Sequence, residues 1–85
     1  VDPAELRRLA AGLKRFNSEL SNQMASLHGQ LINLGESWRD QEHQKFAEEF
    51  VQTMKVMQKF LDASQQHIPF LLRKAERIED YLQQK

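Results

Sequence analysis

The chain has 85 residues, the size of one small domain, and its 12 basic and 12 acidic residues give a formal net charge of zero. Zero net charge argues against a nucleic-acid binder, because binding DNA or RNA without sequence preference requires a basic surface. No apolar run approaches the roughly 20 residues that span a bilayer, so we expect no membrane insertion, and the first residues predict no cleavable signal peptide. The chain has no Cys, so disulfides cannot supplement a small core, and oligomerisation is the common remaining way to stabilise it.

The first segment predicts one long helix over residues 3–34. Asp2 is a suitable N-cap, Pro3 fits the first helical position, and Glu5 lies where its side chain can reach back to the cap. Large apolar residues then recur every three or four positions, which is the period of about 3.5 typical of a helical bundle. They are Leu6, Leu9, Leu13, Phe16, Leu20, Met24, Leu27, Leu31 and Leu34.

A turn over residues 35–39 separates this segment from a second helical pattern. Gly35 follows the last periodic residue and suits a left-handed position after a helix end. Trp38 is the only Trp in the chain. Asp40 is the favoured N-cap of the next helix, with Ser37 as the alternative.

The second helix is predicted over about residues 40–84. Its apolar stripe has one polar member, Ser64, and comprises Phe46, Phe50, Met54, Met57, Leu61, Ser64, Ile68, Leu71, Ala75, Ile78 and Leu82. Pro69 falls inside the pattern, where it removes the hydrogen bond to the Gln65 carbonyl. We therefore expect a kink or short break near residues 66–69. The fold class is all-α: residues 1–85 form a single antiparallel helical hairpin.

The hairpin leaves part of the second helix without a partner if the chain folds back about Ser37. The start of the first helix then faces about residue 70, and the apolar residues after Pro69 overhang. Either this part folds back as a third helix or a second subunit covers it. We favour the second subunit, because no turn residues precede Pro69. The expected dimer-interface residues are Phe50, Met54, Met57, Leu61, Ile68, Leu71, Ile78 and Leu82.

Charge is distributed unevenly along this hairpin. Residues 1–17 and 68–85 together hold eight basic and five acidic side chains, whereas residues 34–50 hold five acidic and two basic ones. Two antiparallel copies would place each acidic turn beside a basic open end, and such patterns select orientation. We therefore predict an antiparallel dimer that forms a four-helix bundle.

The sequence Leu34-Gly35-Glu36-Ser37-Trp38, followed by Phe46 eight residues after the Trp and Phe50 one turn later, resembles the Trp-x-Gly (WXG) family. These are small, early-secreted-antigen-like proteins exported by type VII secretion systems, and the likeness in length and turn position covers essentially the whole chain. The family's Gly two residues after the Trp is Asp40 here, which as an N-cap can still open a helix.

The resemblance implies a homodimer, or a heterodimer with a paralogous hairpin protein, that a membrane ATPase of the secretion system recognises in its folded state. It implies a secreted factor or an export partner of another protein, cytoplasmic before export. The family's C-terminal Tyr-x-x-x-Asp/Glu export signal is not matched, because Lys85 follows Tyr81 at that spacing. A paired subunit or a natural tail beyond Lys85 would then carry the signal.

The candidate recognition residues lie at the turn and are Gly35, Trp38, Asp40 and Phe46. We expect Trp38 to be a pin between the helices that also offers an anchor to a partner, and Phe46 and Phe50 to be core. His28, His43 and His67 lack metal-ligand spacing, and no nucleophile motif is present. We therefore expect no catalytic residues, metal or cofactor, and predict a non-enzymatic binding protein. The alternative is a structural helical adaptor or scaffold subunit of another assembly.

Overall fold

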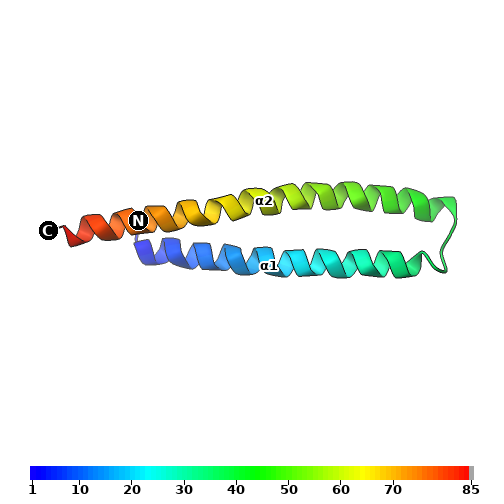
Figure 1. The fold of residues 1–85 in the computed structure, drawn as a ribbon, viewed down its shortest axis with the longest axis horizontal. Helices are drawn as coiled ribbons and strands as arrows, with labels where there is room; N and C mark the ends of the chain where they lie inside the picture. Colours follow the sequence, from blue (N-terminus) through cyan, green and yellow to red (C-terminus); the bar gives the residue numbers. More distant parts are fainter. Residues whose placement is uncertain (85) are drawn as a thin grey trace.

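A computed structural model describes residues 1–84 as two long antiparallel helices joined by one turn (Figure 1). Helix α1 spans Pro3–Leu34 and helix α2 spans Gln41–Gln83. The predicted helical hairpin is confirmed. Its principal dimensions are 70 × 16 × 13 Å, and its radius of gyration of 19.6 Å far exceeds the roughly 12 Å of a compact chain of this length.

Both helices begin at aspartate caps. The Asp2 carboxylate accepts a hydrogen bond from the Ala4 N–H at 2.9 Å, and the Asp40 carboxylate accepts one from the His43 N–H at 3.0 Å. These acceptors satisfy backbone donors that have no partner inside the helix. The expected left-handed Gly35 is wrong: its φ and ψ are −62° and −15°, so it continues the right-handed helix.

The seam between the helices is lined by residues spaced three and four positions apart. Its most buried members are small or polar with the exception of Leu61, and they are Ala10, Asn17, Leu61, Ser64 and Ala75. The predicted stripe of α1 holds only in part. Five of its members are half-buried, namely Leu6, Leu13, Leu20, Met24 and Leu31. The other four, Leu9, Phe16, Leu27 and Leu34, are 46 to 53% exposed, and Ala10 and Asn17 occupy the seam instead. The larger residues flank the seam because small side chains allow the two helices to approach each other.

The pairing register also differs from the symmetric fold about Ser37. That fold would place Asn17 opposite Met57, whereas Asn17 accepts a hydrogen bond from Ser64, seven positions further along. The shift arises because residues 35–38 continue helical hydrogen bonding from α1, so the chain reverses closer to Asp40.

The expected overhang after Pro69 is consequently much shorter. Arg7 donates to Glu79 through Nε at 3.1 Å, and Ala75 is completely buried. Ile68, Leu71 and Ile78 are half-buried. The end of α2 projects past the start of α1 (Figure 1), and Tyr81 and Leu82 near this end are 75% and 49% exposed.

Helix α2 passes through Pro69 without interruption, so the structure contains neither the break nor a third helix among the described residues. Pro69 is exposed, and the helix around it curves gently in Figure 1. One missing hydrogen bond is tolerated because Ile68 and Leu71 keep the helix packed on α1 on both sides of the proline. Within residues 1–84, neither helix carries a segment apolar and long enough to cross a membrane.

Candidate interaction surface

The backbone of the turn holds Trp38 in a defined position. The Leu34 carbonyl accepts hydrogen bonds from the Ser37 N–H at 3.1 Å, the Trp38 N–H at 2.9 Å and the Ser37 hydroxyl at 3.3 Å. Gly35 N–H in turn donates to the carbonyls of Leu31 and Ile32 at 3.1 Å. The end of α1 is thus well capped, and the position of the Trp38 backbone follows from it.

Trp38 starts a short row of rings at the beginning of α2. Its indole meets His43 edge-on, with ring centroids 5.0 Å apart, and lies 6.2 Å from Phe46, which is itself 6.2 Å from Phe50. Trp38 and Phe50 are half-buried. Phe46, expected in the core, is 47% exposed because it lies beside the seam and α1 does not cover it.

His43 packs between Trp38 and Gly35. A Cβ added at Gly35 would lie 3.2 Å from His43 Cε1 and 3.3 Å from Nε2, so the missing side chain of Gly35 makes room for the imidazole. His43 Nε2 is buried without a hydrogen-bond partner in this single chain. A polar atom in that position is normally paired, which marks the turn as a place where a further group can bind.

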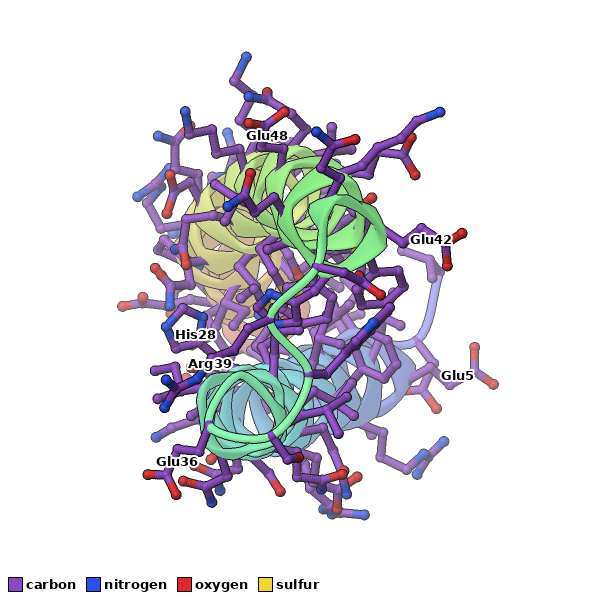
Figure 2. All side chains as sticks on the ribbon, turned by 90° about the vertical axis from the view of Figure 1, so that its right-hand side faces the viewer. Glu5, His28, Glu36, Arg39, Glu42 and Glu48 are labelled. Carbon is purple, nitrogen blue, oxygen red and sulfur yellow. The ribbon has the colours of Figure 1, made fainter. Side chains whose placement is uncertain are left out.

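The surface around these rings is acidic. Seen from the turn end, Glu36, Glu42 and Glu48 point outward from the helix pair (Figure 2). Protein interfaces commonly have aromatic side chains at their centre, where they anchor the partner, and polar side chains at their rim. The ring row with its surrounding charged side chains has this arrangement.

Large exposed apolar side chains recur along one side of the seam, and we call this side the apolar flank. It contains six large side chains that are 46 to 53% exposed: Leu9, Phe16, Leu27, Leu34, Phe46 and Phe60. The rings of Phe16 and Phe60 meet edge-on across the two helices, with centroids 6.2 Å apart. The flank therefore includes side chains of both helices. At the end nearest the turn, it meets the ring row at Phe46.

The predicted dimer-interface residues lie mainly in the seam of the hairpin. Leu61 is 2% exposed, and Leu82 at the projecting end is 49% exposed. The other six are half-buried, so each still presents part of its surface: Phe50, Met54, Met57, Ile68, Leu71 and Ile78. The structure adds the apolar flank as the larger exposed surface beside them.

Sequence reasoning missed Asn17, a buried polar residue of the seam. Its Oδ1 accepts from the Ser64 hydroxyl at 3.0 Å, and both residues are at most 5% exposed. The signal was present: Ala10, Leu13, Asn17, Leu20 and Met24 continue the three-and-four spacing, and Ser64 is the polar member of the opposite stripe. A buried polar pair of this kind specifies which residues face each other.

The ionisable groups of the described residues form no cluster of three metal-ligating side chains. The hydrogen bond from Arg7 lowers the pKa of Glu79, and the same bond raises the pKa of Arg7. This pair lies at the open end of the hairpin, opposite the acidic turn, where it connects the beginning of α1 to the end of α2.

The family model described as "WXG100: Proteins of 100 residues with WXG" matches residues 1–82. The chain belongs to the WXG100 family. Similar solved structures include three forms of the secreted protein EsxB from Bacillus anthracis str. Sterne. One point variant has a TM-score of 0.88 at 27% identity and covers 95% of this chain and 94% of its own.

A second EsxB point variant has a TM-score of 0.84 at 28% identity, with coverage of 94% and 92%. The selenomethionine-labelled EsxB has a TM-score of 0.85 at 27% identity, with coverage of 95% and 92%. Among curated proteins, none matches this sequence. As a WXG100 protein, the chain carries Trp38 at the hairpin turn and uses Asp40, at the motif's Gly position, to cap α2. The resemblance noted in the sequence is confirmed, and it supports a helical protein associated with type VII secretion.

Proposed function

We propose that this protein acts without catalysis, as an antiparallel dimer that serves as a secreted factor or export partner of a type VII-like secretion system. The observation that carries the proposal is the exposure of large apolar side chains. None is fully buried among the described residues, and 14 remain exposed. Fully burying a large apolar side chain contributes about 1.5 to 3 kcal/mol, and the side chains of the apolar flank are about half exposed. Covering each of them therefore contributes roughly half of that amount, which favours a second chain on the apolar flank.

Charge supports an antiparallel arrangement. Two hairpins placed head to tail on their apolar flanks would bring each acidic turn, with Glu36 and Glu42, to a basic open end with Arg8 and Arg15. Exposed charges contribute little affinity, but they disfavour the parallel alternative, in which like charges would meet. The half-buried seam residues, including Phe50 and Met54, would then complete a four-helix core.

Leu27→Glu tests the flank. Leu27 is 47% exposed on the flank, whereas Val51 is 39% exposed on another face of α2, so Val51→Glu is the matched control. Sedimentation equilibrium at micromolar concentration should show a dimer for the wild type and for Val51→Glu, and a helical monomer for Leu27→Glu. A wild-type monomer that pairs only with an added paralogous hairpin would indicate a heterodimer, and a dimer that tolerates Leu27→Glu would refute the proposed face.

The ring row at the turn is the proposed recognition site for the export machinery or cargo, with Trp38 as its anchor and Gly35, Asp40 and Phe46 shaping it. Trp38→Ala should reduce secretion while the dimer persists. The measurement compares culture supernatants of a host with an active type VII system and of the same host lacking its secretion ATPase. Secretion of wild-type protein that does not depend on the ATPase would contradict this role and favour a structural adaptor.

A further inference from the structure

The part of the apolar flank that lies on α1 has a symmetric spacing. Its four exposed members are Leu9, Phe16, Leu27 and Leu34, separated by 7, 11 and 7 positions. The midpoint of this row falls between Ser21 and Asn22. Such a row matches a second copy of itself when the two copies run in opposite directions, so the flank is suited to a twofold axis at its midpoint.

The hairpin places an aromatic ring of α2 at the same height. The hydrogen bond between Asn17 and Ser64 aligns the two antiparallel helices. Ser21 follows Asn17 by four residues and Phe60 precedes Ser64 by four, so Ser21 and Phe60 lie at one height. Phe60 is 48% exposed on the flank, and its ring meets that of Phe16. The midpoint of the α1 row therefore lies beside an exposed phenylalanine.

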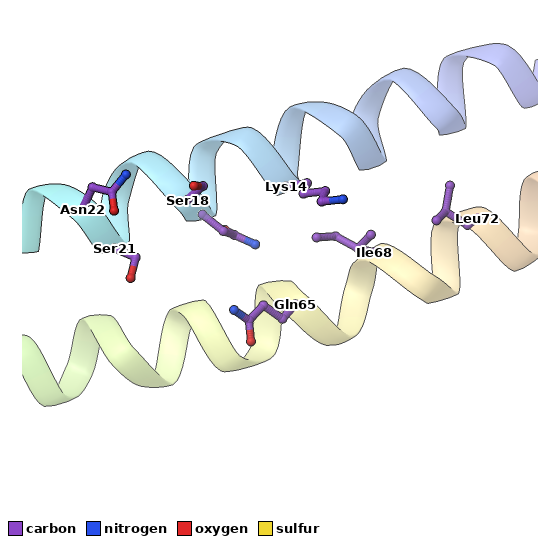
Figure 3. Close-up of a pocket in the computed structure, with 8 residues that line it drawn as sticks. Lys14, Ser18, Ser21, Asn22, Gln65, Ile68 and Leu72 are labelled. Atoms are coloured by element: carbon purple, nitrogen blue, oxygen red, sulfur yellow. The ribbon is translucent and has the colours of Figure 1, made fainter.

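The other side of the seam carries polar side chains over the same stretch. Figure 3 shows Ser18, Ser21, Asn22 and Gln65 there, from both helices. Because successive residues of a helix are about 100° apart, Ser18 is turned roughly 200° from Phe16. Covering hydroxyl and carboxamide groups without new hydrogen bonds costs free energy, so this side is the less favourable place for a second chain.

We propose that the partner on the apolar flank is a second copy of this chain, and that the twofold axis of the homodimer passes beside Phe60. The inference rests on the dimer of the proposed function and adds its partner and its alignment. Each α1 then lies antiparallel to its copy, with Leu9 against Leu34 and Phe16 against Leu27 of the second copy. Phe60 meets Phe60 of the second copy at the axis, which places aromatic rings at the centre of the interface.

Charged side chains of α2 fit this alignment. Glu42, Glu49 and Lys74 are exposed and lie within about 40° of Phe60 around the helix axis. With Phe60 on the axis, Lys74 is opposite Phe46 of the second copy. Glu42 and Glu49 lie about one helical turn to either side of Phe46, so each Lys74 meets two carboxylates. Exposed pairs of this kind select the alignment more than they add affinity.

Single cysteines test the axis, because the chain contains no Cys of its own. In a twofold dimer, only a residue at the axis can form a disulfide with its own copy, since the bond needs Cα atoms within about 7 Å of each other. Oxidised at micromolar concentration, Phe60→Cys should become covalent dimer almost completely on a gel without reductant. Lys59→Cys is the matched control: Lys59 is exposed at the same height but turned about 100° from Phe60. It should stay at the background that both variants show in urea.

Two mixtures test the alignment away from the axis. Leu9→Cys and Leu34→Cys should not cross-link alone, whereas an equal mixture should give a covalent dimer of the two variants. Thr53 and His67 are exposed, and each lies seven positions from Phe60. A mixture of Thr53→Cys and His67→Cys should therefore cross-link as well. This second mixture leaves every ring and aliphatic side chain of the flank in place, so it decides the alignment even if Phe60→Cys prevents dimerisation.

Sedimentation of the wild type separates failure of the axis from failure of the dimer. A wild-type monomer would refute the homodimer and its axis together. A wild-type dimer in which the Thr53→Cys and His67→Cys mixture stays at background would refute the axis and leave the dimer standing. The same conclusion would follow if Phe60→Cys dimerises but cross-links no better than Lys59→Cys, or if Leu9→Cys cross-links efficiently with itself.

Discussion

At the scale of single residues, the Asn17–Ser64 pair determines how the two helices align. Both helices repeat apolar residues every three or four positions, so sliding one past the other by one repeat would still bury an apolar stripe. The polar pair opposes such a slip, because a slipped register would bury the Asn17 carboxamide against apolar side chains without any partner.

Ser64→Ala should therefore lower the free energy of unfolding by about 1 to 3 kcal/mol, since it leaves the whole Asn17 amide unpaired in the seam. The double variant Asn17→Leu/Ser64→Ala should recover this loss, because an apolar pair needs no hydrogen bonds. Urea unfolding followed by circular dichroism measures both. If Ser64→Ala stays within about 0.5 kcal/mol of the wild type, the pair does not hold the register.

Replacing Gly12 or Gly35 by alanine should affect stability differently. A Cβ at Gly12 would have nothing within 4 Å, so Gly12→Ala should stabilise α1 by about 0.5 to 1 kcal/mol. A Cβ at Gly35 would press on the His43 ring, which Trp38 holds from the other side. Gly35→Ala should give no such gain, and the gain should return when His43→Ala is added. Thermal unfolding of Gly12→Ala, Gly35→Ala, His43→Ala and the double variant Gly35→Ala/His43→Ala decides between these outcomes. Equal gains at both glycines in the otherwise unchanged chain would exclude a steric role for Gly35.

At the scale of the elements, Pro69 is the one residue that local propensity would exclude from α2. Its cost in a helix interior is about 3 kcal/mol relative to Ala, and it is exposed, so Pro69→Ala loses little packing. We expect a stabilisation of about 1 to 3 kcal/mol, measured by urea unfolding at fixed protein concentration. A destabilised variant would instead mean that the curvature imposed by Pro69 is needed to bring Ile68 and Leu71 onto α1.

The Arg7–Glu79 pair joins the far ends of the two helices and makes their attachment sensitive to acid. The pKa of Glu79 is lowered in the folded chain from an ordinary value of 4.5. Its stabilisation is therefore fully present above that value and is lost as the pH falls through the lower folded pKa. Glu79→Gln should melt at a slightly lower temperature than the wild type at neutral pH and at the same temperature at about pH 2. Glu48→Gln changes an exposed carboxylate and is the control, so its melting temperature should equal that of the wild type at both pH values. If the melting temperature of Glu79→Gln is lower than that of the wild type by the same amount at both pH values, the effect comes from packing and not from charge.

The two helices and the turn were predictable because their signals are local. Asp2, Pro3 and Asp40 mark helix starts, and the apolar period marks the lengths. The register of the helix pair and the face of α1 that enters the seam could not be predicted, because both depend on the conformation of the turn. A right-handed Gly35 extends α1 before the chain reverses, and small Ala10 and Asn17 occupy the seam in place of Leu9 and Phe16. The place of Trp38 in the turn was predicted from its position in the sequence. The packing of His43 against Trp38 was not predicted, because the His43 ring is buried only where Gly35 leaves space for it.

At the scale of the whole molecule, a hairpin with a thin seam has little stability of its own. Its buried residues are few, and most of its large apolar side chains retain exposed surface. If a second chain covers them, folding and assembly are coupled, and the melting temperature must rise with protein concentration.

Calorimetry over about a hundredfold range of concentration tests this coupling. The wild type should show a steady rise in Tm, whereas Leu27→Glu, with its flank interrupted, should show a lower and constant Tm. A constant Tm for the wild type would mean that the single hairpin accounts for its own stability.

The narrow cross-section of the hairpin also bears on transport. A rod 70 Å long and 16 × 13 Å across at the Cα level can be moved end-on through an opening little wider than itself without being unfolded. Pairing side by side widens one dimension and leaves the other nearly unchanged. The acidic, aromatic turn is one leading tip of this rod, and in an antiparallel pair each end would present one such tip, so the assembly could be engaged from either direction.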